Sequence, residues 1–122
     1  MNETVGSILG RKGREIWSVA PEATVYDAIA LMAAKSIGAV LVISEGTLIG
    51  IVSERDYARK VILQGRSSKE TQVREIMTAD LVTVTPEITV DDCMKVMTYS
   101  RIRHLPVLER VGLLVSFRSA TW

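Results

Sequence analysis

The sequence predicts an α+β protein made of two β-α-β-β-α repeats that pack sheet to sheet with pseudo-twofold symmetry. The first observation is an internal repeat, because Pro-Glu-x-Thr-Val occurs at residues 21–25 and again at 86–90. The second is that each motif is followed by helical periodicity and then by a short apolar run typical of a buried strand. Neither copy can bury both faces of its own sheet, so we expect the two to pack against each other.

The repeat extends along most of the chain. The two motifs lie at an offset of 65 residues (86 minus 21), and further identities recur at that offset. The matched pairs are Asp27 and Asp92, Met32 and Met97, Ile37 and Ile102, and Val42 and Val107. Upstream, residues 5–9 match residues 73–77 at an offset of 68 (73 minus 5). The first copy therefore carries a small insertion near residues 10–14.

Each copy opens with a strand and a capped helix. Residues 16–19 and 81–84 carry strand-favouring side chains, and a proline closes each run. Thr24-x-x-Asp27 and Thr89-x-x-Asp92 are helix-start signatures, because the threonine oxygen can accept from a first-turn amide and the acid suits the positive helix end. The positions predicted to be buried are Val25, Ala28 or Ile29, and Met32 in the first helix, and Val90, Met94 and Met97 in the second.

A hairpin and a second helix complete the first copy. Residues 39–43 and 48–52 are short apolar runs joined by Glu45-Gly46, which favours a tight turn. Residues 56–64 are predicted to form a helix that ends at Gly65. Its predicted inward side chains are Tyr57, Ala58, Val61 and Ile62.

The second copy departs from this plan near its end. We predict a hairpin at residues 108–116, but residues 117–122 contain no acid to match Asp56 and no final helix. A native ending, a truncation and a frameshift all remain open. We divide the chain into a first repeat at 1–65 with an N-terminal helical segment, a polar linker at 66–72, and an incomplete second repeat at 73–122, together forming one compact module.

Composition restricts the classes of function. The 122 residues are 48% hydrophobic and 24% charged, which is ordinary for a globular domain. The formal net charge of +1 argues against generic binding to nucleic acid or to an anionic membrane. A single cysteine, Cys93, excludes an internal disulfide and suits a reducing compartment. The N-terminus has no signal-peptide pattern and no apolar run reaches spanning length, so we expect a cytoplasmic protein.

The order of these motifs resembles the cystathionine-β-synthase (CBS) domain, and their duplication resembles the tandem pair called a Bateman module. The resemblance covers about residues 5–116. The segments that carry it are residues 19–25, 36–42 and 50–56 in the first copy and residues 84–90 and 101–107 in the second.

The resemblance implies a function. Members of this family are generally not enzymes; they bind AMP, ADP, ATP, NAD or S-adenosylmethionine in clefts between the two copies, and modules commonly associate in pairs. We therefore expect a homodimeric regulatory module that senses adenine nucleotides and acts on a separate effector protein, without a catalytic cofactor. The alternative is a dimerisation or interaction scaffold with vestigial nucleotide sites. An enzyme is disfavoured because no nucleophile–base pair or metal cluster is apparent.

Residues 53–56 match the family's hydroxyl-x-x-acid signature. Asp56 can accept hydrogen bonds from two ribose hydroxyls, while Ser53 and Arg55 can contact phosphate. The same residues also fit a capping box without any ligand, in which Ser53 caps a helix and Asp56 bonds back to it. Residues alone leave both roles open.

By the same resemblance, both copies line the cleft that holds Asp56. The further candidates are Ile37, Thr78, Ala79, Thr83, Ile102, Arg103, His104, Leu105 and Pro106. Ile37, Ile102 and Leu105 would enclose the adenine. Arg103 and Arg101 would supply positive charge to the phosphate, but for Arg101 the role of a solvated surface side chain is equally expected. The short basic segment at residues 12–14 could touch phosphate in the other cleft. His104, the only histidine, has no ligand cluster around it and is not expected to bind a metal.

Overall fold

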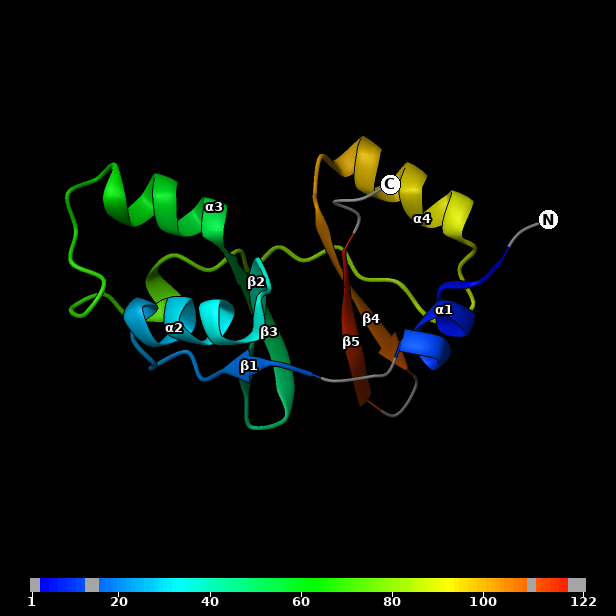
Figure 1. Ribbon diagram of the computed structural model, residues 1–122, viewed down its shortest axis with the longest axis horizontal. Coiled ribbons are helices and arrows are strands. Elements are labelled where there is room, and N and C mark those ends of the chain that lie inside the picture. The colour runs from blue at the N-terminus through cyan, green and yellow to red at the C-terminus, as the bar shows by residue number, and fades with distance from the viewer. Residues whose placement is uncertain (1–2, 13–15, 110–111, 119–122) are drawn as a thin grey trace. The chain divides into compact units, whose positions relative to one another are not determined.

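The computed structural model describes residues 3–12, 16–109 and 112–118 and confirms a mixed α+β fold (Figure 1). Its elements in chain order are α1 (Val5–Lys12), β1 (Ser18–Val19), α2 (Val25–Lys35), β2 (Ala39–Ser44), β3 (Thr47–Ser53), α3 (Glu54–Tyr57), a π-helical turn (Ala58–Ile62), a 3-10 turn (Val73–Glu75), α4 (Val90–Ser100), β4 (His104–Glu109) and β5 (Gly112–Arg118). The chain forms two compact units, residues 17–81 and residues 1–16 with 82–122. None of the described helices is long and apolar enough to cross a membrane.

The unit at residues 17–81 is built on a three-stranded sheet in the order β1-β2-β3. β1 runs parallel to β2, and β2 pairs antiparallel with β3. The predicted hairpin turn is confirmed, because Glu45 and Gly46 both have left-handed backbone angles, with φ of 51° and 78°. The predicted core of α2 is confirmed as well: Val25, Ala28 and Met32 are buried in one apolar cluster with side chains from β2 and β3.

The second helix of this unit differs from the prediction. It begins at Glu54 rather than at residue 56, because Ser53 caps it. From Ala58 onward it is π-helical, and the Leu63 N–H donates to the Ala58 carbonyl oxygen at 3.0 Å, a five-residue step. The wider turn breaks the three-and-four spacing on which the prediction depended. Val61 is buried as expected, but Ala58 and Ile62 are exposed.

The other unit joins α1 and α4 to the antiparallel pair β4 and β5. Its core cluster consists of Val5, Cys93, Met97, Leu105 and Val107. α4 is confirmed as a helix, and its buried side chains are Cys93 and Met97. Val90 and Met94, predicted to be buried, are only half-buried.

The predicted strand at residues 81–84 is wrong. Val82 and Thr83 are exposed, and only Val84 pairs with β4, as an isolated parallel bridge to Val107. The Val84 N–H donates to the Pro106 carbonyl at 3.1 Å, and the Leu108 N–H donates to the Val84 carbonyl at 2.8 Å. With two backbone bonds at a single residue the segment is extended but is not a regular strand.

Each unit also contains the leading segment of the other sequence copy. α1, from the first copy, binds the backbone of residues 86–88, and the 3-10 turn, from the second copy, binds residues 21–23. The bonds are Val5 N–H to Ile88 O (2.9 Å), Gly6 N–H to Pro86 O (2.8 Å), Val73 N–H to Ala23 O (2.8 Å) and Arg74 N–H to Pro21 O (3.1 Å). The compact units are therefore not the sequence repeats, and the division at residues 65 and 73 stays a prediction.

Candidate functional site

The junction between β3 and α3 holds the Ser53–Asp56 signature. Ser53 is the last residue of β3 and the N-cap of α3, and its Oγ accepts from the Asp56 N–H at 3.1 Å. In return, Asp56 Oδ2 accepts from the Ser53 N–H at 3.0 Å and from the Ser53 hydroxyl at 3.1 Å. The capping box that the sequence allowed is therefore present in full.

A lysine that the sequence analysis did not single out completes this network. Lys60 Nζ lies 3.1 Å from Asp56 Oδ1 and donates to the Ile76 carbonyl oxygen at 2.8 Å. The Asp56 side chain is 13% exposed, whereas that of Lys60 is 45% exposed. The four-residue spacing of Asp56 and Lys60 could have indicated the ion pair. The bond to Ile76, sixteen residues away, has no local sequence signal.

The hydrogen bonds at Asp56 limit what the carboxylate can do. A carboxylate offers about four lone-pair sites. Among the described residues, Oδ2 accepts two hydrogen bonds from Ser53, and Oδ1 forms an ion pair with Lys60 at 3.1 Å. Oδ1 therefore keeps lone-pair sites for a further donor, and that donor would lie beside the Lys60 ammonium group.

Two further predicted segments lie beside this junction. The Glu54 N–H donates to the carbonyl of Gly38 at 3.0 Å, so the residue after Ile37 contacts the first turn of α3. Thr78 pairs with Ile51, two residues before Ser53, through bonds of 2.9 and 3.0 Å. Ile37 is half-buried against the core, while Arg55, Thr78 and Ala79 are exposed. These are the predicted residues that belong to the unit at 17–81.

The remaining predicted residues belong to the other unit. Leu105 is fully buried in the core and Pro106 is buried with its carbonyl bonded to Val84, so packing accounts for both. Ile102 is half-buried against that core, and His104 is the half-buried first residue of β4. The exposed members are Thr83, Arg101 and Arg103. Lys12 ends α1, and residues 13–14 lie outside the described residues. That both copies line one cleft stays a prediction.

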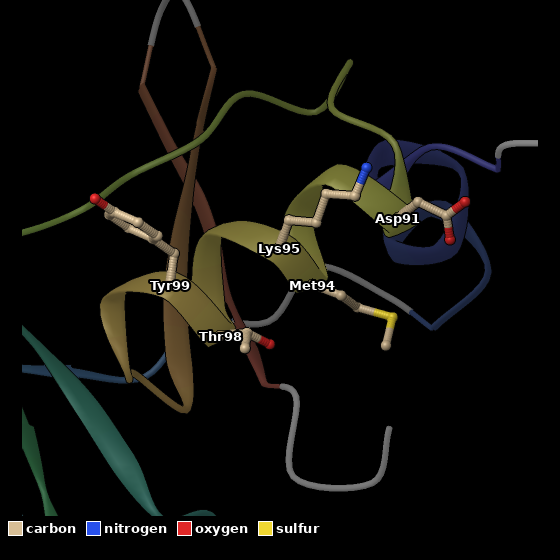
Figure 2. Close-up of a pocket in the computed structure, with 5 residues that line it drawn as sticks. All are labelled: Asp91, Met94, Lys95, Thr98 and Tyr99. Carbon is tan, nitrogen blue, oxygen red and sulfur yellow. The ribbon is translucent and has the colours of Figure 1, made fainter.

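A surface depression on α4 was not predicted. It is lined by five residues of α4, which lie three and four positions apart and so neighbour one another on the helix surface: Asp91, Met94, Lys95, Thr98 and Tyr99 (Figure 2). Tyr99 is 92% exposed. The depression thus combines the apolar and aromatic surface of Met94 and Tyr99 with the charged side chains of Asp91 and Lys95.

Neither a reactive thiol nor a metal centre is evident in the described part of the chain. Cys93 is buried in the core, and burial raises the pKa of its thiol, which disfavours the thiolate. Within residues 3–12, 16–109 and 112–118 no group of three His, Cys, Asp or Glu side chains could hold a metal ion.

The comparisons with known proteins agree with this architecture. The chain is 43% identical over 121 residues to a mitochondrial CBS domain-containing protein of Arabidopsis thaliana; the match covers 91% of this chain and 58% of that protein. It is 30% identical over 108 residues to inosine-5'-monophosphate dehydrogenase of Thermoplasma acidophilum, covering 88% of this chain and only 21% of the enzyme.

Solved structures match along nearly the whole chain. A CBS-domain protein from Burkholderia ambifaria is 51% identical, with a TM-score of 0.91, over 95% of this chain and 88% of that one. A hexameric CBS-CP12 protein from cyanobacteria is 30% identical, with a TM-score of 0.86, over 97% and 65%. The CBS domain model itself matches residues 5–63 and 73–114. The chain therefore belongs to the CBS-domain family and carries two CBS domains in tandem.

Proposed function

We propose that the chain is a regulatory module that binds an adenine nucleotide of the AMP, ADP, ATP or NAD class and acts on a separate effector protein. One observation carries the proposal. The Asp56 carboxylate is mostly shielded from solvent, is oriented by Ser53 and Lys60, and keeps acceptor capacity on Oδ1 for a ribose hydroxyl. Arg55, exposed next to it, is the candidate partner for phosphate.

The relatives support a regulatory rather than a catalytic role. The matched part of the Thermoplasma dehydrogenase is about a fifth of that enzyme, whose name states that it acts on a nucleotide. A segment of this kind thus accompanies a nucleotide enzyme without being most of it. We extend a regulatory role of this kind to the present chain, as a module that is not itself an enzyme. We place the chain in a reducing compartment such as the cytoplasm, where Cys93 stays a thiol.

A second candidate function is a dimerisation or interaction scaffold. The observation in its favour is that contacts within the chain already satisfy much of the Asp56 carboxylate, through two hydrogen bonds from Ser53 and an ion pair with Lys60. The exposed side chains on α4 and the hexameric assembly of the CBS-CP12 protein favour association as well. A homodimer is compatible with either function.

Thermal unfolding with and without ligand separates the two candidates. A ligand that binds only the folded chain raises its free energy of unfolding, by about 2.7 kcal/mol at a concentration 100 times Kd. We expect AMP, ADP, ATP, NAD or S-adenosylmethionine to raise the melting temperature. If none of the five does so, the scaffold is the better function.

The assignment of Asp56 is tested by a matched pair of variants. Asp56→Ala removes the acid of one capping box, and Glu75→Ala removes that of another in the same unit, where Glu75 accepts from the Gln72 N–H at 2.7 Å. Both lose a cap, but only Asp56→Ala loses the proposed ribose acceptor. Calorimetry should show nucleotide affinity weakened roughly 10- to 100-fold in Asp56→Ala and unchanged in Glu75→Ala. Equal affinity in both would exclude Asp56 from the site.

A further inference from the structure

Residues 76–78, here called the connector, end at Thr78, which pairs with β3 in the unit at 17–81. Thr78 exchanges two hydrogen bonds with Ile51 of β3, at 2.9 and 3.0 Å. The approach to β3 is close, since a Cβ on Gly50 would lie 2.6 Å from Met77 Sδ and 3.2 Å from the Thr78 carbonyl oxygen. Three residues beyond Thr78 the unit ends and the chain enters the other unit. The connector therefore lies just before one of the two points at which the chain passes between the units, the other being between Ile16 and Trp17.

Lys60 joins this connector to the candidate nucleotide site. Its ammonium group has three donors. It lies 3.1 Å from Asp56 Oδ1 and donates one hydrogen bond of 2.8 Å to the carbonyl of Ile76. The lysine comes from the π-helical turn that directly follows α3, so one side chain contacts both the acid of the capping box and the connector backbone. Ile76 itself is buried in the core, which fixes one end of the link.

We propose that Lys60 is a positioning residue that couples the Asp56 carboxylate to the connector. A ribose hydroxyl that donates to Asp56 would approach Oδ1, because Oδ2 already accepts both hydrogen bonds from Ser53, and Oδ1 is the atom that forms the ion pair with Lys60. Binding therefore competes with Lys60 for Oδ1 and alters its hold on the Ile76 carbonyl. The inference rests on the proposed function for the identity of the ligand, but the link between Lys60, Asp56 and the connector can be tested without one.

Hydrogen exchange of individual amides, measured by NMR on the full chain without ligand, tests the link. Lys60→Met keeps the aliphatic stem and removes the charge, and we expect it to speed exchange of the Thr78 N–H about fivefold, as for the loss of one hydrogen bond. Asp56→Asn should have a similar effect, and Lys60→Arg should restore slow exchange. The double variant that combines Lys60→Met with Asp56→Asn should again speed exchange of the Thr78 N–H about fivefold, rather than about 25-fold, because both substitutions break the same link from Asp56 through Lys60 to the connector.

Controls separate this coupling from general destabilisation. Arg59→Met, an exposed neighbour on the same turn, should leave the Thr78 amide unchanged. The Ala28 N–H in α2, which donates to the Thr24 carbonyl at 3.2 Å, should exchange at the wild-type rate in every variant. Unchanged exchange of Thr78 in Lys60→Met, or multiplicative effects in the double variant, overturns the proposal.

AMP serves as the probe for the ligand step. If AMP binds the wild-type chain, exchange at residues 76–78 should change on binding, and the change should vanish in Lys60→Met. The same change in both proteins overturns the coupling. If AMP and the other four adenosyl ligands fail to bind wild type, the proposed function fails instead, and the double-variant comparison alone decides whether Lys60 links Asp56 to the connector.

Discussion

Substitution of Gly6 by alanine should destabilise the protein, although alanine is the better helix former. In a solvated helix the change from glycine to alanine stabilises by about 1 kcal/mol. Gly6 lies in α1, where its N–H donates to the Pro86 carbonyl oxygen at 2.8 Å. A Cβ there would lie 2.9 Å from Pro86 Cβ and 3.0 Å from Pro86 O. Both atoms are held by a ring or by backbone, so neither can rotate away.

The net magnitude follows from these opposing effects. Forcing a methyl group into a filled contact costs about 1–3 kcal/mol. After the gain in helix propensity, Gly6→Ala should lower the free energy of unfolding by up to about 2 kcal/mol. Urea unfolding followed by circular dichroism measures this difference, and the slope of the transition checks that a single cooperative transition is retained.

Ser7→Ala is the matched control. Ser7 is the next residue of α1 and is exposed, so propensity alone should act and stabilise by about 0.5 kcal/mol. The expected result is a change of opposite sign at two adjacent positions. A gain of about 1 kcal/mol for Gly6→Ala would mean that α1 does not contact Pro86, and would refute the exchange of leading segments between the repeats.

Three further predictions concern caps, pH and the cysteine. Ser36 and Arg101 cap α2 and α4 with left-handed backbones, at φ of 55° and 56°, so Ser36→Gly and Arg101→Gly should each stabilise by about 0.5–1 kcal/mol; a lower melting temperature in both variants would contradict this strain. A hydrogen bond from the Gln72 N–H, which is the larger cause, and a second one from the Arg66 side chain hold the pKa of Glu75 below its ordinary value of 4.5. A depressed folded-state pKa contributes stability above 4.5 that is lost as the pH falls through the folded value, so Glu75→Gln should be less stable than wild type at pH 7 and approach it in acid. Identical pH profiles in chemical denaturation would rule this contribution out. Cys93 is fully buried, so its thiol should resist iodoacetamide at pH 8 in the folded chain and react at once in urea; rapid labelling of native protein would show that the α4 core opens.

Part of the candidate site could be predicted from sequence, and part could not. The Ser53-x-x-Asp56 spacing indicated both a cap and a ligand, and the cap is formed because its partners are three residues apart. The role of Lys60 required the structure, since its bond to Ile76 joins residues that only folding brings together. Leu105 looked like a wall for an adenine from sequence, but its side chain is taken up by the core.

The sequence by itself determined the repeat, the helix starts at Thr24 and Thr89, the Glu45-Gly46 turn and the family, because these depend on contacts between near neighbours and on a spacing that is read directly. Tertiary structure decided the rest. Residues 81–84 favour a strand by composition, yet a strand needs a partner along its whole length, and only Val84 has a bridge to one. The exchange of leading segments depends on which backbone groups meet after folding, and local propensity carries no information about that.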